Sequence, residues 1–179
     1  MRRYAAATAA ALCLTATLAA PAATAAGGAA GNGGDEGWRP VEYPPVNYPA
    51  GERCDFAFRT EPLVDETMVK TVATYPDGSP KTELYKGALL VRVTNLETGA
   101  TYDADAGGRS IVQYAPDGGH VYYATGPFLM GVLEGRGNLP RGEYLVDGVY
   151  TVEITADDYR SVEWKGNAKK LTDVCDRID

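Results

Sequence analysis

Side chains that could act as a nucleophile or a base are few in this sequence. His120 is the single histidine, and it follows the turn residues 116–119 at the start of an expected strand. A hydrolytic triad needs a base beside its nucleophile. The serines are Ser79, which lies in a turn, Ser110 and Ser161, and none has the surroundings of a nucleophile elbow. We therefore expect no triad, and we interpret His120 as a polar residue at the shoulder of a hairpin.

Metal-binding patterns are equally sparse. Zinc sites combine several His or Cys ligands at short spacing, which one histidine and two distant cysteines cannot supply. Calcium prefers oxygen ligands in loops, and Asp103 and Asp105 stand two residues apart just before Gly107 and Gly108. The terminal glutamate of a full calcium loop is absent. Asp103 and Asp105 are thus a weak calcium candidate, with a solvated acidic loop as the simpler interpretation, and we expect no cofactor.

Paired carboxylates could in principle hydrolyse a glycosidic bond. Such pairs stand about 5–9.5 Å apart across a cleft. Glu134, Glu143 and Glu153 are available, but the sequence does not place any two of them face to face. No catalytic residue is therefore assigned.

The first 25 residues are typical of a secretory signal peptide. Arg2 and Arg3 precede an apolar run, and small residues of the A-x-A kind follow at Ala23–Ala25. The alternative, a membrane anchor, requires about 20 strongly apolar residues, whereas this run is mostly Ala and Thr. We expect a secreted, extracellular protein with no membrane span.

Charge limits the partners of the mature protein. The full chain has 17 basic and 24 acidic residues and a net charge of −7. Removing Arg2 and Arg3 with the signal peptide leaves a net charge of −9. Because the phosphate backbone repels so acidic a protein, we expect no nucleic-acid partner. We expect a monomer that meets an extracellular macromolecule or a small ligand.

Two cysteines, Cys54 and Cys175, remain after the signal peptide is removed. An even number of cysteines in an oxidising compartment indicates a disulfide, and only one pairing exists. The bridge would close a loop of about 120 residues, worth roughly 4–5 kcal/mol in the chain-entropy model. Two separate buried thiols are the alternative. We expect a β domain over 53–179 closed by this bridge.

Residues 26–52 have the composition of a linker rich in Gly, Pro and Tyr. Its prolines favour extended chain. Trp38, Tyr43 and Tyr48 either fold back on the domain as a strap or form a displayed aromatic segment. We favour the strap.

From Cys54 onward, short runs rich in Val, Tyr, Thr and Ile alternate with turn signals, and no segment has sustained helical periodicity. The turn signals lie at residues 76–78, 97–99, 116–119, 147–148 and 165–167. Tight turns leave no room for parallel crossovers. We predict an all-β antiparallel meander of about eight to ten strands, as a small β-barrel in preference to a β-sandwich. The apolar spacing of residues 171–178 indicates a short C-terminal helical turn.

Three strands are especially clear. Residues 88–96 and 149–154 alternate apolar and polar side chains, which is typical of a sheet with one wet face. Residues 128–133 are apolar on both faces, which predicts a central strand or one that crosses between two layers. Tyrosine is abundant, with 12 in the chain against three phenylalanines. We favour the interpretation that tyrosine serves as a good strand former, and a recognition surface is the alternative. Tyr122 and Tyr123 should point to opposite faces of their strand.

Several segments together resemble a group of uncharacterised secreted proteins of high-GC Gram-positive bacteria. The segments are Cys54–Phe56, Tyr75–Gly78, Gly87–Gly99, Pro116–Gly118, Thr125–Pro127 and Thr172–Cys175. The resemblance spans essentially all of 54–175. It implies export, paired end cysteines and a β fold, and it carries no activity and no catalytic residue.

Three functions remain. The leading hypothesis is a non-catalytic extracellular binding or structural module, because catalytic sets are missing and loops and tyrosines offer contact surfaces. The second is a β-barrel that carries a small apolar ligand, since barrels of about eight strands can hold one. The third is a barrel enzyme of isomerase or cyclase type.

Overall fold

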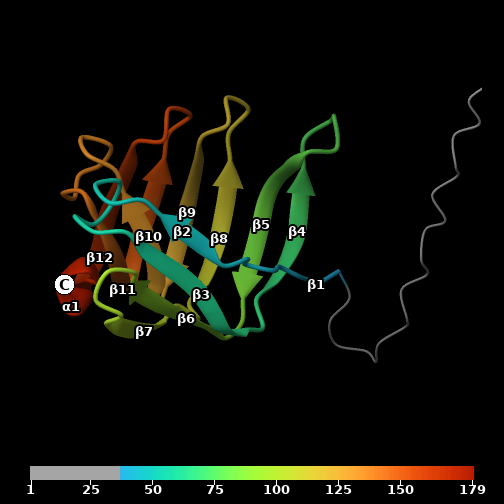
Figure 1. Cartoon of the computed structure of the whole chain (residues 1–179). Coiled ribbons are helices and arrows are strands. Elements are labelled where there is room, and N and C mark those ends of the chain that lie inside the picture. Colours follow the sequence, from blue (N-terminus) through green and yellow to red (C-terminus); the bar gives the residue numbers. More distant parts are fainter. Residues whose placement is uncertain (1–36) are drawn as a thin grey trace, which may run out of the picture. The chain divides into compact units, whose positions relative to one another are not determined.

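The computed structural model describes residues 37–179, apart from the side chains at 167 and 168 (Figure 1). The chain divides into two units, Met1–Gly33 and Gly34–Asp179, and the description concerns the second. The predicted signal peptide lies outside the described residues. The elements are β1 (Arg39–Pro40), β2 (Val46–Tyr48), β3 (Phe58–Asp65), β4 (Met68–Thr74), β5 (Pro80–Lys86), β6 (Leu89–Asn95), β7 (Thr101–Asp105), β8 (Arg109–Tyr114), β9 (His120–Thr125), β10 (Phe128–Val132), β11 (Gly142–Ile154), β12 (Arg160–Asp173) and α1 (Cys175–Ile178).

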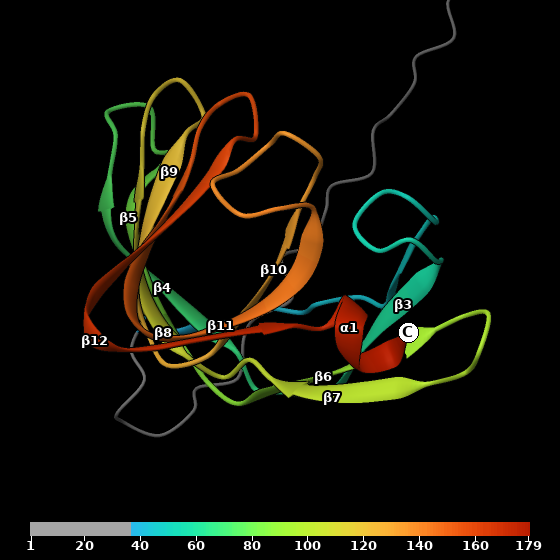
Figure 2. The same ribbon diagram turned by 90° about the vertical axis from the view of Figure 1, so that its left-hand side faces the viewer.

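The strands form two antiparallel sheets. The eight-stranded sheet has the order β1-β4-β5-β8-β9-β11-β10, with β12 also paired to β11, and the four-stranded sheet has the order β2-β3-β6-β7. The larger sheet is strongly curled, and the smaller sheet lies beside it, as the two views in Figures 1 and 2 show. The all-β prediction and the C-terminal helical turn are therefore confirmed.

The prediction of a small β-barrel is wrong, because the larger sheet does not close on itself. The two ends of its strand order, β1 and β10, are not neighbours, and β12 pairs with β11 off this path. The chain leaves this sheet to build β6 and β7 in the smaller sheet, so the topology is also not a simple meander. A meander barrel and this pair of sheets can use the same tight turns. They differ in which strands pair with one another.

The chain passes between the two sheets at a crowded corner. β3 leads into β4 and β5 leads into β6, and each of these connections passes from one sheet to the other. Gly87 lies in the second connection with a φ of 138°, and a Cβ there would collide with the carbonyl of Glu66 in the first. Glycine is required because any side chain would separate the two crossing backbones.

A crease bends the larger sheet. Gly148 interrupts β11 with a φ of 121°, and the register between β11 and β12 shifts there. The Gly148 carbonyl accepts a hydrogen bond from Gly126, in the break between β9 and β10. The prediction of chain reversals at 147–148 and 165–167 is wrong, because both segments lie inside long strands. A glycine with positive φ suits a β-bulge as well as a turn.

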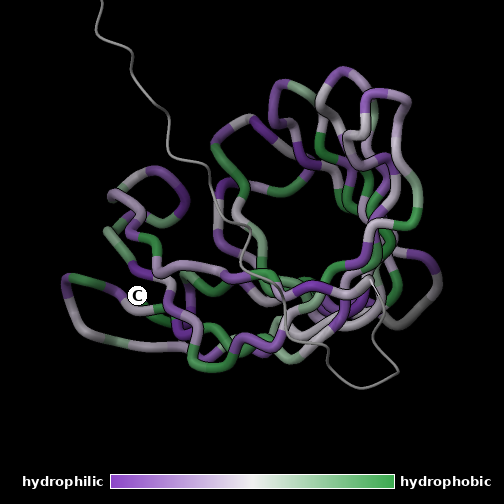
Figure 3. Tube along the Cα trace, turned by 90° about the vertical axis from the view of Figure 1, so that its right-hand side faces the viewer, coloured by the Kyte–Doolittle hydropathy of each residue, from purple (hydrophilic) through white to green (hydrophobic). Residues whose placement is uncertain are grey.

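The hydrophobic core has two clusters. One lies under the larger sheet and includes Val132, Tyr150 and Val152, and the other lies mainly under the smaller sheet and includes Phe58 and Val93. Apolar and polar residues alternate along the strands that supply them (Figure 3). The one-sided alternation predicted for 88–96 and 149–154 matches this burial.

β10 contacts both clusters, but it lies at the end of the larger sheet's strand order and its partner strand within residues 37–179 is β11, so the prediction of a central strand or of one that crosses between two layers is wrong. Met130 and Val132 belong to the cluster of the larger sheet, whereas Leu129 packs against that of the smaller sheet. The two sheets are therefore packed together at β10 and the start of β11, where Leu145 also joins the second cluster.

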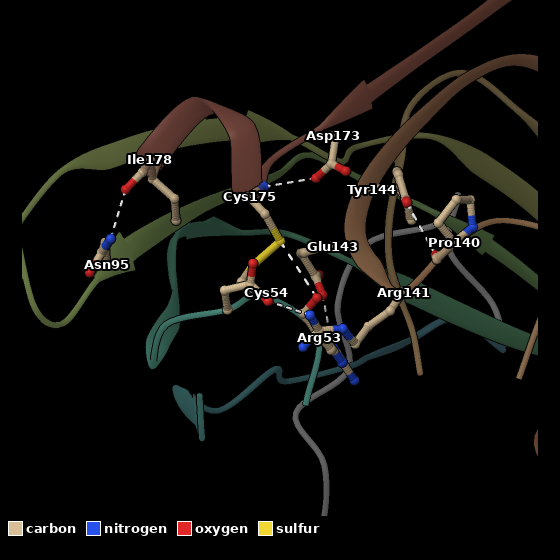
Figure 4. Close-up of a disulfide and its surroundings, with 11 residues drawn as sticks. Arg53, Cys54, Asn95, Pro140, Arg141, Glu143, Tyr144, Asp173, Cys175 and Ile178 are labelled. Carbon is tan, nitrogen blue, oxygen red and sulfur yellow. Dashed lines mark hydrogen bonds and ion pairs between the residues drawn. A yellow bond between two sulfur atoms is a disulfide. The ribbon is translucent and has the colours of Figure 1, made fainter. Parts of the chain in front are cut away.

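The disulfide joins Cys54 to Cys175, as predicted, across 121 residues. It connects the segment before β3 to the start of α1 (Figure 4). The buried side chain of Ile178 fills the second cluster, and Asn95 donates a hydrogen bond of 2.8 Å to its carbonyl. These contacts hold the end of the larger sheet against the smaller sheet.

The aromatic segment before Cys54 folds back as the strap that we favoured. β1 pairs with β4 in the larger sheet, and β2 pairs with β3 in the smaller sheet. The ring of Tyr48 stacks on Phe58 with 4.7 Å between centroids, and Lys86 lies over the Trp38 ring. The strap thus bridges the two sheets through residues 41–45.

Candidate functional site

A cavity of about 660 Å³ lies between the concave face of the larger sheet, the smaller sheet and the strap. The larger sheet contributes Tyr122, Phe128 and Val152 to its wall, and the smaller sheet contributes Leu89. Tyr43 of the strap completes the lining. Binding sites for small molecules have volumes of this order and the same mainly apolar, aromatic walls. We call this space the inter-sheet cavity.

An aromatic row crosses the concave face. The rings of Tyr114 and His120 lie 5.7 Å apart, those of His120 and Tyr122 lie 5.4 Å apart, and those of Tyr122 and Phe128 lie 5.4 Å apart. Tyr114 comes from β8, His120 and Tyr122 come from β9, and Phe128 comes from β10. Tyr122 lies between Val112 of β8 and Val152 of β11. Burial raises the pKa of Tyr122, so its hydroxyl stays neutral and can hydrogen-bond.

One end of the cavity is charged. Arg53 donates a hydrogen bond of 2.8 Å from Nη1 to Oε2 of Glu143, and Figure 4 shows the two side chains pointing toward each other beside the disulfide. The Arg53 guanidinium also lies 4.0 Å from the centre of the Tyr48 ring. Burial raises the pKa of Glu143 by more than Arg53 lowers it. We call these side chains, together with Arg160, the arginine end.

Arg160 reaches the same place from β12. Its Nη1 donates a hydrogen bond of 2.6 Å to the carbonyl of Gly131, and its Nε and Nη2 donate to Oδ1 of Asp158. Arg53 lies against Gly131 too, because a Cβ at that position would collide with the Arg53 side chain. Two guanidinium groups therefore meet at one glycine of β10.

A second buried carboxylate, Glu83 of β5, forms a closed network elsewhere on the larger sheet. It accepts hydrogen bonds from Thr71 at 2.8 Å, Tyr85 at 2.8 Å, Tyr114 at 3.0 Å and Arg39 at 3.1 Å. Burial raises the pKa of Glu83, but the hydrogen bonds from Thr71, Tyr85 and Tyr114 and the charge of Arg39 lower it further, below its ordinary value. We call this group the Glu83 network.

The tyrosines of this network have raised pKa values. Burial and the bonds to its neighbours raise the pKa of Tyr85, and burial is also the largest cause that raises the pKa of Tyr114 to about 12. Glu83 is ionised and both tyrosines are neutral near pH 7, so none of them is poised to exchange a proton. The network joins β1, β4, β5 and β8 and acts as a structural tie.

The structure does not bring together the residues that were considered for a triad. His120 opens β9, as expected, and packs its ring between Tyr114 and Tyr122. Ser79 instead donates its hydroxyl to Asp77 inside the β4–β5 turn. Ser110 lines the inter-sheet cavity from β8.

The weak calcium candidate has other partners. Asp103 of β7 accepts two hydrogen bonds from Arg92, at 2.7 and 2.8 Å, and Asp105 accepts one from the backbone of Gly107. Gly107 packs against the Gly87 connection at the corner between the sheets, so it serves the crossing of the chain. Among residues 37–179, no group of three or more His, Cys, Asp or Glu side chains could hold a metal ion.

The three glutamates considered for glycoside chemistry lie in different surroundings. Glu143 is buried against Arg53, whereas Glu134 lies exposed near Arg141 and Glu153 lies exposed on β11. Neither Arg53 nor Glu83 was predicted from the sequence to be a functional side chain. Arg53 stands directly before Cys54, and this position next to a predicted disulfide was the signal that the sequence offered.

Many tyrosines serve the fold through their hydroxyl groups. Tyr150 donates to the Gly126 carbonyl, and Tyr144 donates to the Pro140 carbonyl. Tyr122 and Tyr123 point to opposite faces, as predicted, since Tyr122 lines the cavity and Tyr123 is 47% exposed. Tyr43 and Tyr122 are thus the tyrosines best placed to meet a ligand.

Comparisons with known proteins identify no relative of this chain. No protein-family model, curated protein or solved structure matches it. The resemblance to secreted proteins of high-GC Gram-positive bacteria therefore stays a prediction. In the part of the chain that the structure describes, no helix has the length and apolar character needed to cross a membrane.

Proposed function

We propose that this protein is a secreted, non-catalytic binding protein that holds a small molecule in the inter-sheet cavity. The observation that carries the proposal is the cavity of about 660 Å³, lined by residues of both sheets and the strap. Its volume lies within the range of about 300–1,000 Å³ that is typical of ligand sites. The carrier hypothesis thus survives without the barrel on which it was first based.

The chemistry of the wall favours a ligand with an apolar body. Phe128, Leu89 and Val152 supply apolar surface, and Tyr122 supplies a ring with a neutral hydroxyl. Aromatic rings bind flat apolar groups by stacking and edge contacts in addition to the burial of area. A ring system or a short chain that spans this wall fits the site.

The titratable groups support binding without catalysis. A general acid or base works best when its pKa lies near the operating pH. The pKa of Glu83 is lowered by its hydrogen bonds, and the pKa values of Tyr85 and Tyr114 are raised away from neutrality. These groups contribute stability and no proton transfer.

A fluorescent dye tests the proposal. N-phenyl-1-naphthylamine brightens in apolar sites, and we expect it to bind the wild-type protein in a saturable titration. Ser110→Trp places a large ring in the cavity and should weaken binding about tenfold or more. Gln113→Trp, on the opposite face of β8, is the matched control. Equal binding by both variants would contradict the cavity as the site.

Export is a part of the same proposal. The predicted signal peptide and the Cys54–Cys175 disulfide support it, because such bridges form in oxidising compartments. The protein recovered from culture medium should begin near Ala26, run as a monomer on size exclusion and lack free thiols in denaturant. A full-length, reduced protein confined to the cell would overturn it.

An outward-facing patch favours a second candidate, a contact with an extracellular macromolecule. Ile111 and Tyr123 face each other on β8 and β9 and are 45% and 47% exposed, and Val149 nearby is 49% exposed. Gln113 lies on this same face, since it accepts a hydrogen bond from Tyr123. Dye binding that is lost in Gln113→Trp and kept in Ser110→Trp would favour this surface.

A further inference from the structure

The arginine end of the cavity contains two partly buried guanidinium groups. The side chains of Arg53 and Arg160 are 15% and 21% exposed, and each is paired with one carboxylate. Glu143, the partner of Arg53, is 3% exposed, whereas Asp158, the partner of Arg160, is 46% exposed, so water screens its charge more strongly. The charge of Arg160 is thus the less completely balanced of the two.

The same end contains a hydrogen-bond donor without an acceptor. Nε of Arg53 and Oγ1 of Thr67 are the buried side-chain polar atoms that lack a partner in residues 37–179. Both residues line the inter-sheet cavity. A buried donor without a partner costs free energy, and nearly all such groups in folded proteins are satisfied. Nε itself is covered by protein atoms, so a ligand reaches Arg53 at the part of its side chain that stays exposed.

The position of Arg53 is fixed by its neighbours. The Tyr48 ring and the Gly131 backbone contact its guanidinium group, and Glu143 holds Nη1. The disulfide at the adjacent Cys54 anchors the chain that carries it (Figure 4). A guanidinium group held in this way binds an oxyanion with little loss of side-chain freedom.

We infer that the ligand of the inter-sheet cavity has an apolar body and one terminal oxyanion, a carboxylate or its equivalent, held at Arg53 with Arg160 nearby. This inference rests on the proposed function, because it assigns the chemistry of that same site. The oxyanion lies against the guanidinium groups of Arg53 and Arg160, both of which line the cavity. The apolar body lies along Tyr122 and Phe128.

Two dyes with the same rings test the charge. 8-Anilinonaphthalene-1-sulfonate has the rings of N-phenyl-1-naphthylamine and adds one sulfonate. We expect the wild-type protein to bind the sulfonate dye at least about tenfold more tightly, and added salt to weaken that dye alone. A wild-type protein that binds the neutral dye as tightly as the anionic one overturns the inference.

A paired substitution locates the effect. Arg53→Met with Glu143→Met removes one positive and one negative charge, so the net charge of the protein is unchanged. We expect this double variant to lose the preference for the sulfonate, measured as the ratio of its affinities for the two dyes. Arg141→Met, which removes a guanidinium outside the cavity lining, should keep the preference.

The outcomes separate the two proposals. If neither dye binds the wild-type protein, the proposed function fails and the inference falls with it. If the neutral dye binds in the cavity and the sulfonate gives no advantage, only the inference fails. A preference for the sulfonate that persists in the folded double variant also overturns it. The wild-type comparison needs no variant, so misfolding of the double variant leaves the test intact.

Discussion

Glu83 and Glu143 are both buried on the larger sheet, with exposed fractions of 3% and 2%, yet their surroundings are opposite. Glu83 accepts hydrogen bonds from three hydroxyl groups and one arginine, and these lower its pKa. Glu143 is bonded to Arg53, and burial raises its pKa. Both carboxylate oxygens of Glu83 accept hydrogen bonds within its network. Glu143 is bonded to Arg53, whose side chain also lines the inter-sheet cavity.

This difference assigns the Glu83 network to stability and the arginine end to ligand binding, although both glutamates belong to the same sheet. A fully bonded buried network fixes neighbouring strands, as the Glu83 network does for β4, β5 and β8. A buried ion pair with a donor left over gives little net stability. The arginine end is instead held in place by the disulfide and α1, and the Arg53 side chain lines the cavity.

The disulfide should have the largest effect on stability. Cys54→Ala with Cys175→Ala opens a loop of 121 residues and should lower the free energy of unfolding by about 5 kcal/mol. Urea denaturation at pH 7 measures the change. We also expect dye binding to weaken, because the chain carrying Arg53 is released. A loss below about 1 kcal/mol would show that α1 and β2 hold this end without the bridge.

The ion pair should behave as a coupled unit. Arg53→Met alone leaves Glu143 buried without its partner and should cost about 3–5 kcal/mol. The double variant with Glu143→Met should recover most of that loss, since two apolar side chains of similar volume replace the pair. Urea denaturation of both variants and the wild type tests this. A double variant as unstable as the single one would contradict the account.

The Glu83 network should show a stabilising, pH-dependent contribution. Glu83→Gln should cost about 2 kcal/mol at pH 7, because charged hydrogen bonds are replaced by neutral ones. The folded pKa of Glu83 is below its unfolded value, so its contribution is full above the unfolded pKa and is lost as the pH falls. The deficit of the variant, measured by urea denaturation from pH 7 to 3, should therefore shrink with acid.

Glu143→Gln provides the matched comparison. Burial raises the folded pKa of Glu143, so the stability of the wild type relative to this variant should rise as the pH falls. Opposite pH slopes of the stability difference for Glu83→Gln and Glu143→Gln would sharpen the contrast between the Glu83 network and the arginine end. Parallel slopes would show that Glu143 is as well satisfied as Glu83.

The smallest effects concern single hydroxyl groups. Tyr85→Phe and Tyr114→Phe each remove one hydrogen bond to Glu83 and should cost about 1 kcal/mol in thermal or urea unfolding. Tyr122→Phe alters the cavity wall outside that network and should change stability by less than about 0.5 kcal/mol. Equal losses at all three positions would mean that the network has no special role.

Local patterns predicted much of the secondary structure. The alternation of Leu89, Val91 and Val93 identified β6, and Pro76–Gly78 and Pro116–Gly119 identified two hairpin turns that the structure confirms. These predictions succeed because side-chain direction and turn chemistry depend on neighbouring residues. The crease at Gly148 was missed because the same backbone conformation serves a turn and a bulge.

The partner of each strand could not be predicted in the same way. Gly87 marks the passage of the chain between sheets, but its local sequence is also compatible with a hairpin. The site depends on pairs that lie far apart in the chain, such as Arg53 and Glu143, which are separated by 90 residues. No local pattern encodes such a pair, so the cavity and its charged end emerge only from the fold.

The central claim is that a small molecule binds between the sheets with its charged group at Arg53. A crystal structure with 8-anilinonaphthalene-1-sulfonate tests it most directly. The account predicts the rings against Tyr122 and Phe128 and the sulfonate in contact with the guanidinium group of Arg53. Dye bound instead on the outward face at Ile111 and Tyr123, with the cavity filled only by water, would contradict it.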